Sequence, residues 1–229
     1  MTVTSTPVDA SGPTPTVDRR EPSVERTESV DRHLDAALTL VGRWGVTKTS
    51  LADVAKASGC SRATIYRAFP GGKQQLFHLL AVRELQSYVA EILAVIDAAE
   101  DLEEALTAAL VVASRLVRNH DAAQFILEYE PGLLLPFLGF HEVERVYRAT
   151  AVVVGPHLER FLPTDRAAWA AEWAARIFIT YLFHPGDEGD LANLAQTRHL
   201  VRRFLLPAFS AVEPESTPAP STPQPASPA

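Results

Sequence analysis

The stretch that decides the fold runs from Thr49 to Lys73 and reads TSLADVAKASGCSRATIYRAFPGGK. Its first half begins with Ser50, whose hydroxyl can cap a helix, and Asp53 three residues later completes a capping-box pattern. Gly59 follows the apolar face of this helix, at a turn where a residue without a Cβ adopts a positive φ at little cost. The first half therefore predicts a short helix and a tight turn.

The second half predicts another helix with one buried and one exposed side. Ser61 can cap it, and Ile65 and Phe69 lie four residues apart on the inward side. The outward side carries two guanidinium groups, a phenol and a small apolar side chain, from Arg62, Arg67, Tyr66 and Ala63. Together the two helices have the pattern of a helix-turn-helix, with a third helix starting near Lys73.

The order SLADVA, SGCS and TIYRAFP, followed by a basic residue, resembles the TetR family of bacterial regulators over this N-terminal part of the chain. The resemblance implies an all-α fold, with a three-helix DNA-binding domain and a C-terminal helical bundle for effector binding and dimerisation. Two features depart from the family pattern. Ala68 stands where many relatives carry a histidine or another polar residue, and the Gly71-Gly72 pair lengthens the linker before Lys73.

The chain divides into four predicted parts. Residues 1–26 form a tail without aromatic residues, which we expect to be disordered. Residues 27–88 form the DNA-binding domain, with the motif at 50–69. Residues 89–211 form the effector-binding and dimerisation domain, and residues 212–229 form a second disordered tail rich in proline, serine and threonine.

The first predicted helix begins near Thr27 or Ser29 and ends at Gly45, and we expect Trp44 to pack under the helix-turn-helix. Later helices are predicted from Lys73 to about Asp97 and from 102 to 120. Another covers 143–154, with an interruption at Gly155-Pro156. The last two run from 163–164 to 183 and onward from about 190.

Charge is unevenly distributed along the 229 residues, of which 47% are hydrophobic. The formal net charge is −7, yet residues 40–73 carry six basic residues against one acidic residue, a net +5 that leaves −12 for the rest. A basic patch on an acidic body suits a protein that approaches a polyanion in one orientation. The alternative is an ordinary solvated face.

The sequence holds no pattern typical of catalysis, metal binding or membrane insertion. Cys60 is the single cysteine, and we interpret it as a small filler in the turn. His141 to Arg145 lacks the second histidine of a zincin motif. With no signal peptide and no apolar run of about 20 residues, we expect a soluble cytoplasmic protein with no cofactor and no metal, and not an enzyme.

For DNA binding we assign Arg62 and Arg67 to base edges, because guanidinium groups pair bidentately with guanine, and Ala63 to a thymine methyl group. The residues expected to contact phosphates are Thr49, Ser50, Ser61, Thr64, Tyr66 and Lys73.

An effector pocket is predicted in the C-terminal bundle. Apolar and aromatic side chains predominate among the candidates, so we expect a hydrophobic, acyl-chain-like effector, although each could equally be plain core. The candidates are Leu85, Tyr88, Val89, Leu110, Phe125, Tyr129, Phe137, Leu138, Val143, Tyr147 and Phe178.

The last two helices are expected to form a homodimer through a four-helix interface, with a monomeric bundle as the alternative. The interface candidates are Trp169, Trp173, Ile177, Tyr181, Leu194, Val201, Leu205 and Ala208. The sequence thus predicts a dimeric repressor that a small effector releases from a palindromic operator in double-stranded DNA. The alternative is a helical small-molecule-binding protein or enzyme without sequence-specific DNA binding.

Overall fold

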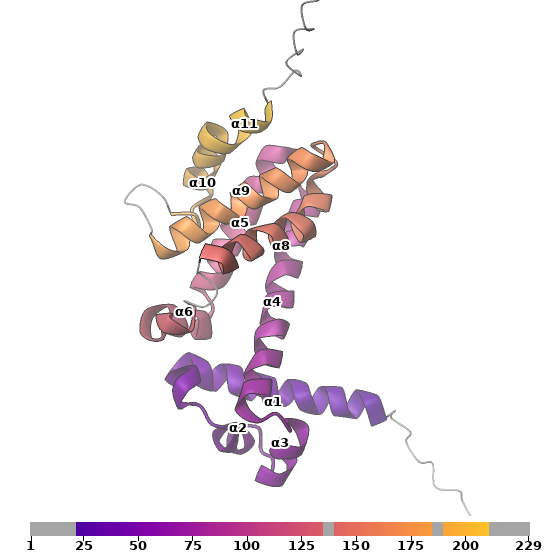
Figure 1. The fold of residues 1–229 in the computed structure, drawn as a ribbon, viewed down its shortest axis with the longest axis vertical. Helices are drawn as coiled ribbons and strands as arrows, with labels where there is room; N and C mark the ends of the chain where they lie inside the picture. Colours follow the sequence, from indigo (N-terminus) through magenta and orange to yellow (C-terminus); the bar gives the residue numbers. More distant parts are fainter. Residues whose placement is uncertain (1–21, 135–139, 185–189, 211–229) are drawn as a thin grey trace, which may run out of the picture.

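The computed structural model describes residues 22–134, 140–184 and 190–210, and every element within them is a helix, which confirms the all-α prediction. The elements are α1 (Pro22–Lys48), α2 (Leu51–Ala57), α3 (Arg62–Ala68), α4 (Gly72–Ala98), α5 (Leu102–Arg118), α6 (Asp121–Tyr129), the 3₁₀ helix η1 (Pro131–Leu133), α8 (Phe140–Leu158), α9 (Thr164–Phe183), α10 (Leu194–Leu200), the π-helical turn η2 (Val201–Leu205) and α11 (Leu206–Ser210) (Figure 1). None of the described helices is long and apolar enough to cross a membrane.

Local hydrogen bonds define α2 and α3 as the sequence predicts. The Ser50 hydroxyl accepts from the Asp53 amide at 3.2 Å, and the Asp53 carboxylate accepts from the Ser50 amide at 3.0 Å. Gly59 has a φ of 71° in the turn. The Ser61 hydroxyl then accepts from the Thr64 amide at 3.1 Å and begins α3. Both predicted caps and the predicted glycine turn are confirmed.

The N-terminal core is the apolar cluster that α1, α2, α3 and the first half of α4 build at the lower end of the molecule (Figure 1). Ile65 and Phe69 are fully buried in it, which confirms the predicted inward side of α3. His33 is buried beside them, with its ring 6.1 Å from that of Phe69 and its Nδ1 3.0 Å from the Ser58 hydroxyl. Burial, followed by the charge of Arg32, lowers the pKa of His33.

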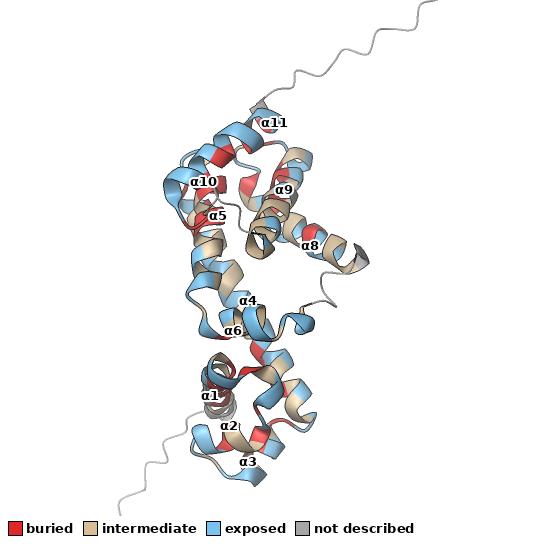
Figure 2. Ribbon diagram, turned by 90° about the vertical axis from the view of Figure 1, so that its left-hand side faces the viewer, coloured by how far each residue is buried: buried red, intermediate tan, exposed pale blue. Residues whose placement is uncertain are grey.

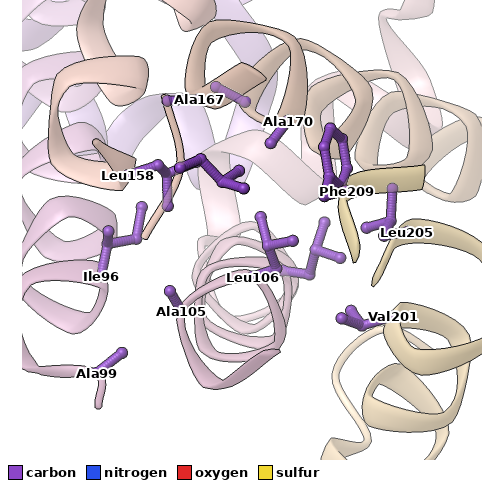
Figure 3. Close-up of a cluster of buried hydrophobic side chains, with 13 residues drawn as sticks. Ile96, Ala99, Ala105, Leu106, Leu158, Ala167, Ala170, Val201, Leu205 and Phe209 are labelled. Atoms are coloured by element: carbon purple, nitrogen blue, oxygen red, sulfur yellow. The ribbon is translucent and has the colours of Figure 1, made fainter. Parts of the chain in front are cut away.

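The C-terminal core is a second cluster, whose side chains converge from α4, α5, α8, α9 and the last helical segments (Figure 3). Small residues let α8 and α9 cross closely: Ala167, Ala170 and Ala171 are buried on α9. On the facing helix, a Cβ added to Gly155 would lie 3.2 Å from the Cα of Ala168. Close approach of the two backbones therefore depends on residues with little or no side chain.

Helix α4 connects the two cores without a break. Leu76 and Leu80 are buried in the N-terminal core, and Ile96 is buried in the C-terminal core. The predicted domain boundary at 88/89 falls inside this helix. Helix α6 lies beside α1 between the two cores (Figures 1 and 2), where a Cβ added to Gly42 would lie 3.0 Å from the Cβ of Asp121.

The start of α1 differs from the prediction. The helix begins at Pro22, so the last five residues of the predicted tail at 1–26 are helical. Proline suits a first helical turn because its missing N–H would have no intrahelical partner there. The rest of that tail, and the predicted tail at 212–229, lie outside the described residues. At the other end Gly45 is non-helical, as predicted, although α1 resumes until Lys48.

Two later helix limits also differ. Helix α8 continues through Pro156 to Leu158, so the predicted interruption is wrong, because the proline lies in the last turn and removes a single hydrogen bond. The last helix begins at Leu194 rather than near 190, since the Asn193 side chain accepts from two amides of the first turn and caps it.

The predicted packing of Trp44 is also wrong. Its side chain is 46% exposed at the end of α1. The space beneath the helix-turn-helix is filled by Leu40 and Leu51, which both belong to the N-terminal core.

Candidate nucleic-acid interface

The outward face of α3 presents a set of solvent-exposed basic, aromatic and small side chains. Arg62, Ala63 and Arg67 are exposed, and Tyr66 is 55% exposed. Within the described part of the chain neither guanidinium group makes a hydrogen bond or an ion pair. Because Ile65 on the opposite side is fully buried, α3 cannot rotate these side chains away from solvent. The donors of both arginines are therefore free for an external acceptor.

The electrostatic surroundings of this face are basic. Asp53 is the one acidic residue between 40 and 73, and hydrogen bonds from Ser50, with smaller contributions from Lys56 and Arg62, lower its pKa. Its carboxylate is occupied by the α2 cap. The negative charge is thus already partnered at the start of α2, and the positive charges beside it remain available to a polyanion.

Three of the hydroxyl groups predicted to contact phosphates sit at helix starts. Ser50 caps α2, while Ser61 caps α3 and lies 2.9 Å from the Thr64 hydroxyl. Ser50 and Ser61 are exposed, and Thr64 is half-buried. Helix N-termini favour anions through their amides and dipole, so Ser61 and Thr64 at the start of α3 suit a phosphate contact. The Ser50 hydroxyl already donates to the Asp53 carboxylate, so its contact with a phosphate stays a prediction.

Thr49 is a correction to the predicted set of phosphate contacts. Its side chain is 0% exposed, and its hydroxyl donates to the Gly45 carbonyl at 2.7 Å. That bond spans the backbone break at Gly45, so the hydroxyl serves the fold and is not available to DNA. Its β-branched side chain is fully enclosed between α1 and α2.

Lys73 lies in the first turn of α4, as predicted, but its ammonium already has one protein partner. The Nζ donates to the Thr47 carbonyl at 2.8 Å and lies 5.6 Å from the centre of the Phe77 ring. An ammonium has three donors, so two remain for a phosphate. Gly72 begins the helix with a φ of 71°, which accommodates the lengthened linker. Ala68 is half-buried and packs against the N-terminal core.

A residue that was not predicted as a site residue contacts the edge of this interface from another part of the chain. The Glu130 carboxylate, just after α6, accepts from the Val46 amide at 2.7 Å and the Thr47 amide at 2.9 Å. Burial alone would raise the pKa of Glu130, but the hydrogen bonds from Thr47 and Val46, together with the charge of Lys73, outweigh it and lower the pKa. No sequence pattern marks this contact, because Glu130 is separated by 84 residues from Val46.

The predicted effector residues do not form one set. Leu110 belongs to the C-terminal core, and Leu85 and Tyr129 are exposed, at 61% and 64%. The two exposed residues are corrections, because a side chain in solvent does not line an internal pocket, whereas Leu110 stays a prediction. Phe125 packs on Tyr129 at a ring distance of 4.9 Å, beside Gly45. Phe137 and Leu138 lie outside the described residues.

The remaining effector candidates belong to α4, α8 and α9 and are at least half-buried. The Tyr88 and Phe178 rings are 6.4 Å apart, and the Tyr88 hydroxyl lies 3.4 Å from the Ala113 carbonyl. Burial raises the pKa of Tyr88. The Arg176 guanidinium stacks over the Tyr147 ring, with its carbon 4.1 Å from the ring centre. Val89 and Val143 are half-buried.

Most of the predicted dimer residues surround an apolar hollow of about 460 Å³ that is lined by α9 and by the segments α10, η2 and α11. Trp169 and Trp173 are 45% and 43% exposed there. Its lining residues are Trp169, Trp173, Ile177, Tyr181, Leu200, Phe204, Leu205 and Ala208.

Two of the predicted dimer residues face inward. Val201 is fully buried in the C-terminal core (Figure 3), so its assignment to an interface is a correction. Leu205 is also buried in this core, but it lines the hollow. Leu194 is exposed but does not line the hollow. Phe204, which is not among the predicted interface residues, is 66% exposed on the π-helical turn. A π-helical register displaces side chains from the 3.6-residue spacing used for the prediction.

Comparison with known proteins agrees with this geometry. Residues 34–80 match the model of "Bacterial regulatory proteins, tetR family". An uncharacterized HTH-type transcriptional regulator of Mycobacterium tuberculosis is 30% identical over 203 residues, which cover 86% of this chain and 96% of that protein. Another regulator from the same species is 29% identical over 108 residues, 47% of this chain and 54% of that one.

Solved structures share the fold. The TetR family repressor AlkX from Dietzia sp., implicated in biodegradation of n-alkanes, has a TM-score of 0.55 and 23% identity, covering 83% of this chain and 98% of that chain. The fatty acid degradation regulator FadR from Bacillus halodurans has a TM-score of 0.52 and 19% identity, covering 77% and 97%. Identity of 30% over almost the whole length of a regulator places this chain in the TetR family: it is a DNA-binding transcriptional regulator and not an enzyme.

Proposed function

We propose that the protein is a dimeric repressor that binds a palindromic operator through α3 and leaves it when a hydrophobic effector binds. The observation that carries the proposal is the outward face of α3, where neither Arg62 nor Arg67 makes a hydrogen bond or an ion pair within the described residues. A recognition helix with free guanidinium groups can read guanine edges in the major groove. Because its ligand is chromosomal DNA, such a repressor would work in the cytoplasm.

The first prediction separates base reading from phosphate binding. Arg62→Ala should weaken operator binding by about 1–3 kcal/mol and relax selection at one base position, because it removes a bidentate contact. Lys73→Ala should instead weaken all sequences alike and reduce the salt slope by about one. Fluorescence anisotropy at several salt concentrations measures the affinity and the salt slope of each variant. The probe is a duplex selected by the wild-type protein from its gene's upstream region, together with single-base variants of that duplex.

Arg148→Ala is the charge-matched control, since Arg148 is exposed on α8, away from α3, and pairs with Glu144 at 3.9 Å. It should leave affinity and selection unchanged. Equal loss of selection in the Arg62 and Lys73 variants would contradict the division of roles. If the wild-type protein bound all duplexes equally, sequence-specific recognition itself would be refuted, in favour of a helical small-molecule-binding protein.

A second copy of the chain is the proposed occupant of the hollow on α9. Exposed tryptophans beside an apolar depression, with Phe204 projecting next to it, are typical of a self-complementary interface. Two α3 helices related by a two-fold axis would then meet half-sites one helical turn apart, about 34–36 Å. The dimer therefore explains why the operator should be palindromic.

The second prediction tests this interface. Phe204→Asp should raise the dimer dissociation constant by roughly 30-fold or more, because a charge would have to be desolvated in an apolar contact. Val152→Asp is the control, since Val152 is 74% exposed on α8 and does not line the hollow. Sedimentation equilibrium measures both constants. A Phe204 variant that dimerises as tightly as the Val152 variant would contradict the assignment.

The effector is proposed to be hydrophobic and to bind between α4, α8 and α9. Tyr88, Phe178 and Val89 supply half-buried apolar surface, and the Tyr88 hydroxyl supplies a single polar group. A ligand releases DNA only if it prefers a conformation in which the two α3 helices no longer match the half-sites. Operator DNA must then weaken effector binding by the same factor.

The third prediction tests this pocket with a fluorescent long-chain fatty acid. Phe178→Ala should weaken its binding about tenfold, because the ring provides apolar contact area, whereas Leu85→Ala should have no effect, since Leu85 is exposed. Calorimetry with and without operator then measures reciprocity. Release of DNA by a polar metabolite, with no fatty-acid binding, would overturn the effector class.

A further inference from the structure

The last part of α1 has a backbone break at Gly45 that leaves two amides in need of acceptors. Gly45 has φ 81° and ψ 170°, so helical hydrogen bonding is interrupted there. Val46 and Thr47 follow this break and lead directly into the Ser50 cap of α2. A backbone amide without a protein partner is costly if buried and leaves the chain free to move if it is hydrated. Whatever binds these amides therefore positions the start of the helix-turn-helix.

Glu130 provides the acceptors from outside the helix-turn-helix. One carboxylate oxygen accepts from Val46 at 2.7 Å and the other from Thr47 at 2.9 Å. This bidentate arrangement, with an ionised acceptor, is the stronger type of hydrogen bond and fixes orientation as well as distance. The lowered pKa of Glu130 indicates that the carboxylate is charged in the folded protein at neutral pH.

Thr47 connects this contact to the phosphate-binding edge. Its amide donates to Glu130, and its carbonyl accepts from the Lys73 ammonium at 2.8 Å. One peptide segment thus joins a residue after α6 to the first turn of α4. The opposite charges of Glu130 and Lys73 also attract each other, because the charge of Lys73 contributes to the lowered pKa of the Glu130 carboxylate.

The backbone at Gly45 lies close to α6 and to Glu130. A Cβ added to Gly45 would lie 2.5 Å from Cε1 of Phe125 and 2.8 Å from the carboxyl carbon of Glu130. Gly42, one turn earlier, is similarly close to Asp121 at the start of α6. Helix α6 and the residue after it therefore approach α1 closely at two glycines, which places the Glu130 carboxylate beside the segment that it binds.

We propose that Glu130 is a positioning residue for operator binding: from the end of α6 it holds the Val46–Thr47 backbone and, through Thr47, orients the Lys73 ammonium toward a DNA phosphate. The inference deepens the proposed function and rests on DNA binding through α3. Glu130 itself does not touch DNA. Its effect is exerted through Thr47. Glu130 accepts a hydrogen bond from the Thr47 amide, and Lys73 donates one to the Thr47 carbonyl.

The test compares Glu130→Ala and Glu130→Gln with Glu128→Gln in the full-length protein. Glu128 is exposed on the last turn of α6, so this control removes the same charge two residues away. Amide hydrogen exchange at Val46 and Thr47 should accelerate at least tenfold in Glu130→Ala, because both acceptors are lost. It should accelerate at one of the two amides in Glu130→Gln, which keeps one acceptor oxygen, and at neither in the control.

Operator binding provides the second measurement, with the duplex selected by the wild-type protein. Glu130→Ala should weaken binding about tenfold and flatten the salt slope as Lys73→Ala does. The Glu130→Ala, Lys73→Ala double variant should bind no more weakly than Lys73→Ala alone, since both changes act on one contact. The base preference at each position should remain that of the wild-type protein, because α3 is untouched.

Three results would overturn the proposal: unchanged exchange at Val46 and Thr47, accelerated exchange with unchanged operator affinity, or additive losses in the double variant. If Glu130→Ala fails to fold, Glu130→Gln decides by the same two measurements. A wild-type protein that selects no DNA sequence would refute the proposed function. Exchange at the two amides would then still report whether Glu130 holds them.

Discussion

Replacing Gly45 with alanine should destabilise the DNA-binding unit by about 2–6 kcal/mol and abolish operator binding. Two effects add. The φ of 81° with ψ of 170° belongs to a region that only glycine adopts readily, at a cost of about 1–3 kcal/mol for other residues. The new methyl group would also meet Phe125 and Glu130, and overpacking typically costs about 1–3 kcal/mol.

Two other glycines separate these effects. Gly59 has a φ of 71° but no atom within 4 Å of an added Cβ, so Gly59→Ala should cost only about 1–2 kcal/mol of backbone strain. Gly132 has open space, and its φ lies outside the positive range, so Gly132→Ala should be nearly neutral. Hydrogen exchange of peptides from α1, α2 and α3 measures all three. A Gly45 variant no less stable than the Gly59 variant would show that the contact with α6 adds nothing.

Leu76→Ala should destabilise the same unit by about 2–5 kcal/mol, as expected for deleting a fully buried leucine side chain. Leu76 is 0% exposed and contacts the N-terminal core from the first half of α4. Ile65 and Phe69 of the α3 region pack into the same core, so loosening this core should also weaken operator binding. Urea unfolding monitored by hydrogen exchange, together with anisotropy on the operator duplex, measures both consequences.

Leu79→Ala provides the same chemical change one turn away on α4. Leu79 is 37% exposed, so its truncation should cost less than about 1 kcal/mol. Equal destabilisation in the two variants would contradict the assignment of Leu76 to the core. A stable Leu76 variant that has lost DNA binding would show that the core affects recognition without contributing to stability.

The part of the site that could be predicted from sequence is the part that short-range contacts determine. The caps at Ser50 and Ser61, the turn at Gly59 and the inward side of α3 all depend on residues at most four positions apart. At such separations the hydrogen bond or the periodicity is encoded in adjacent letters. The arginines on the outer face of α3 follow directly from that periodicity.

Burial was harder to predict, because it depends on what an unrelated segment brings nearby. Thr49 resembles an exposed hydroxyl in the sequence and is fully enclosed. Trp44 resembles a core aromatic and is half exposed. Val201 lies on the apolar stripe of a predicted interface, yet it packs into its own protomer, where the π-helical turn changes the register.

The sequence by itself determined the helix-turn-helix, its caps and the basic character of its outer face, because those features arise from neighbouring residues and from composition. Only the tertiary structure decided how that unit is held. Glu130 and Thr47 are 83 residues apart, and no local pattern connects them. They meet because Gly42 and Gly45 let α6 approach α1, and because the broken helix after Gly45 leaves two amides that a carboxylate can bind.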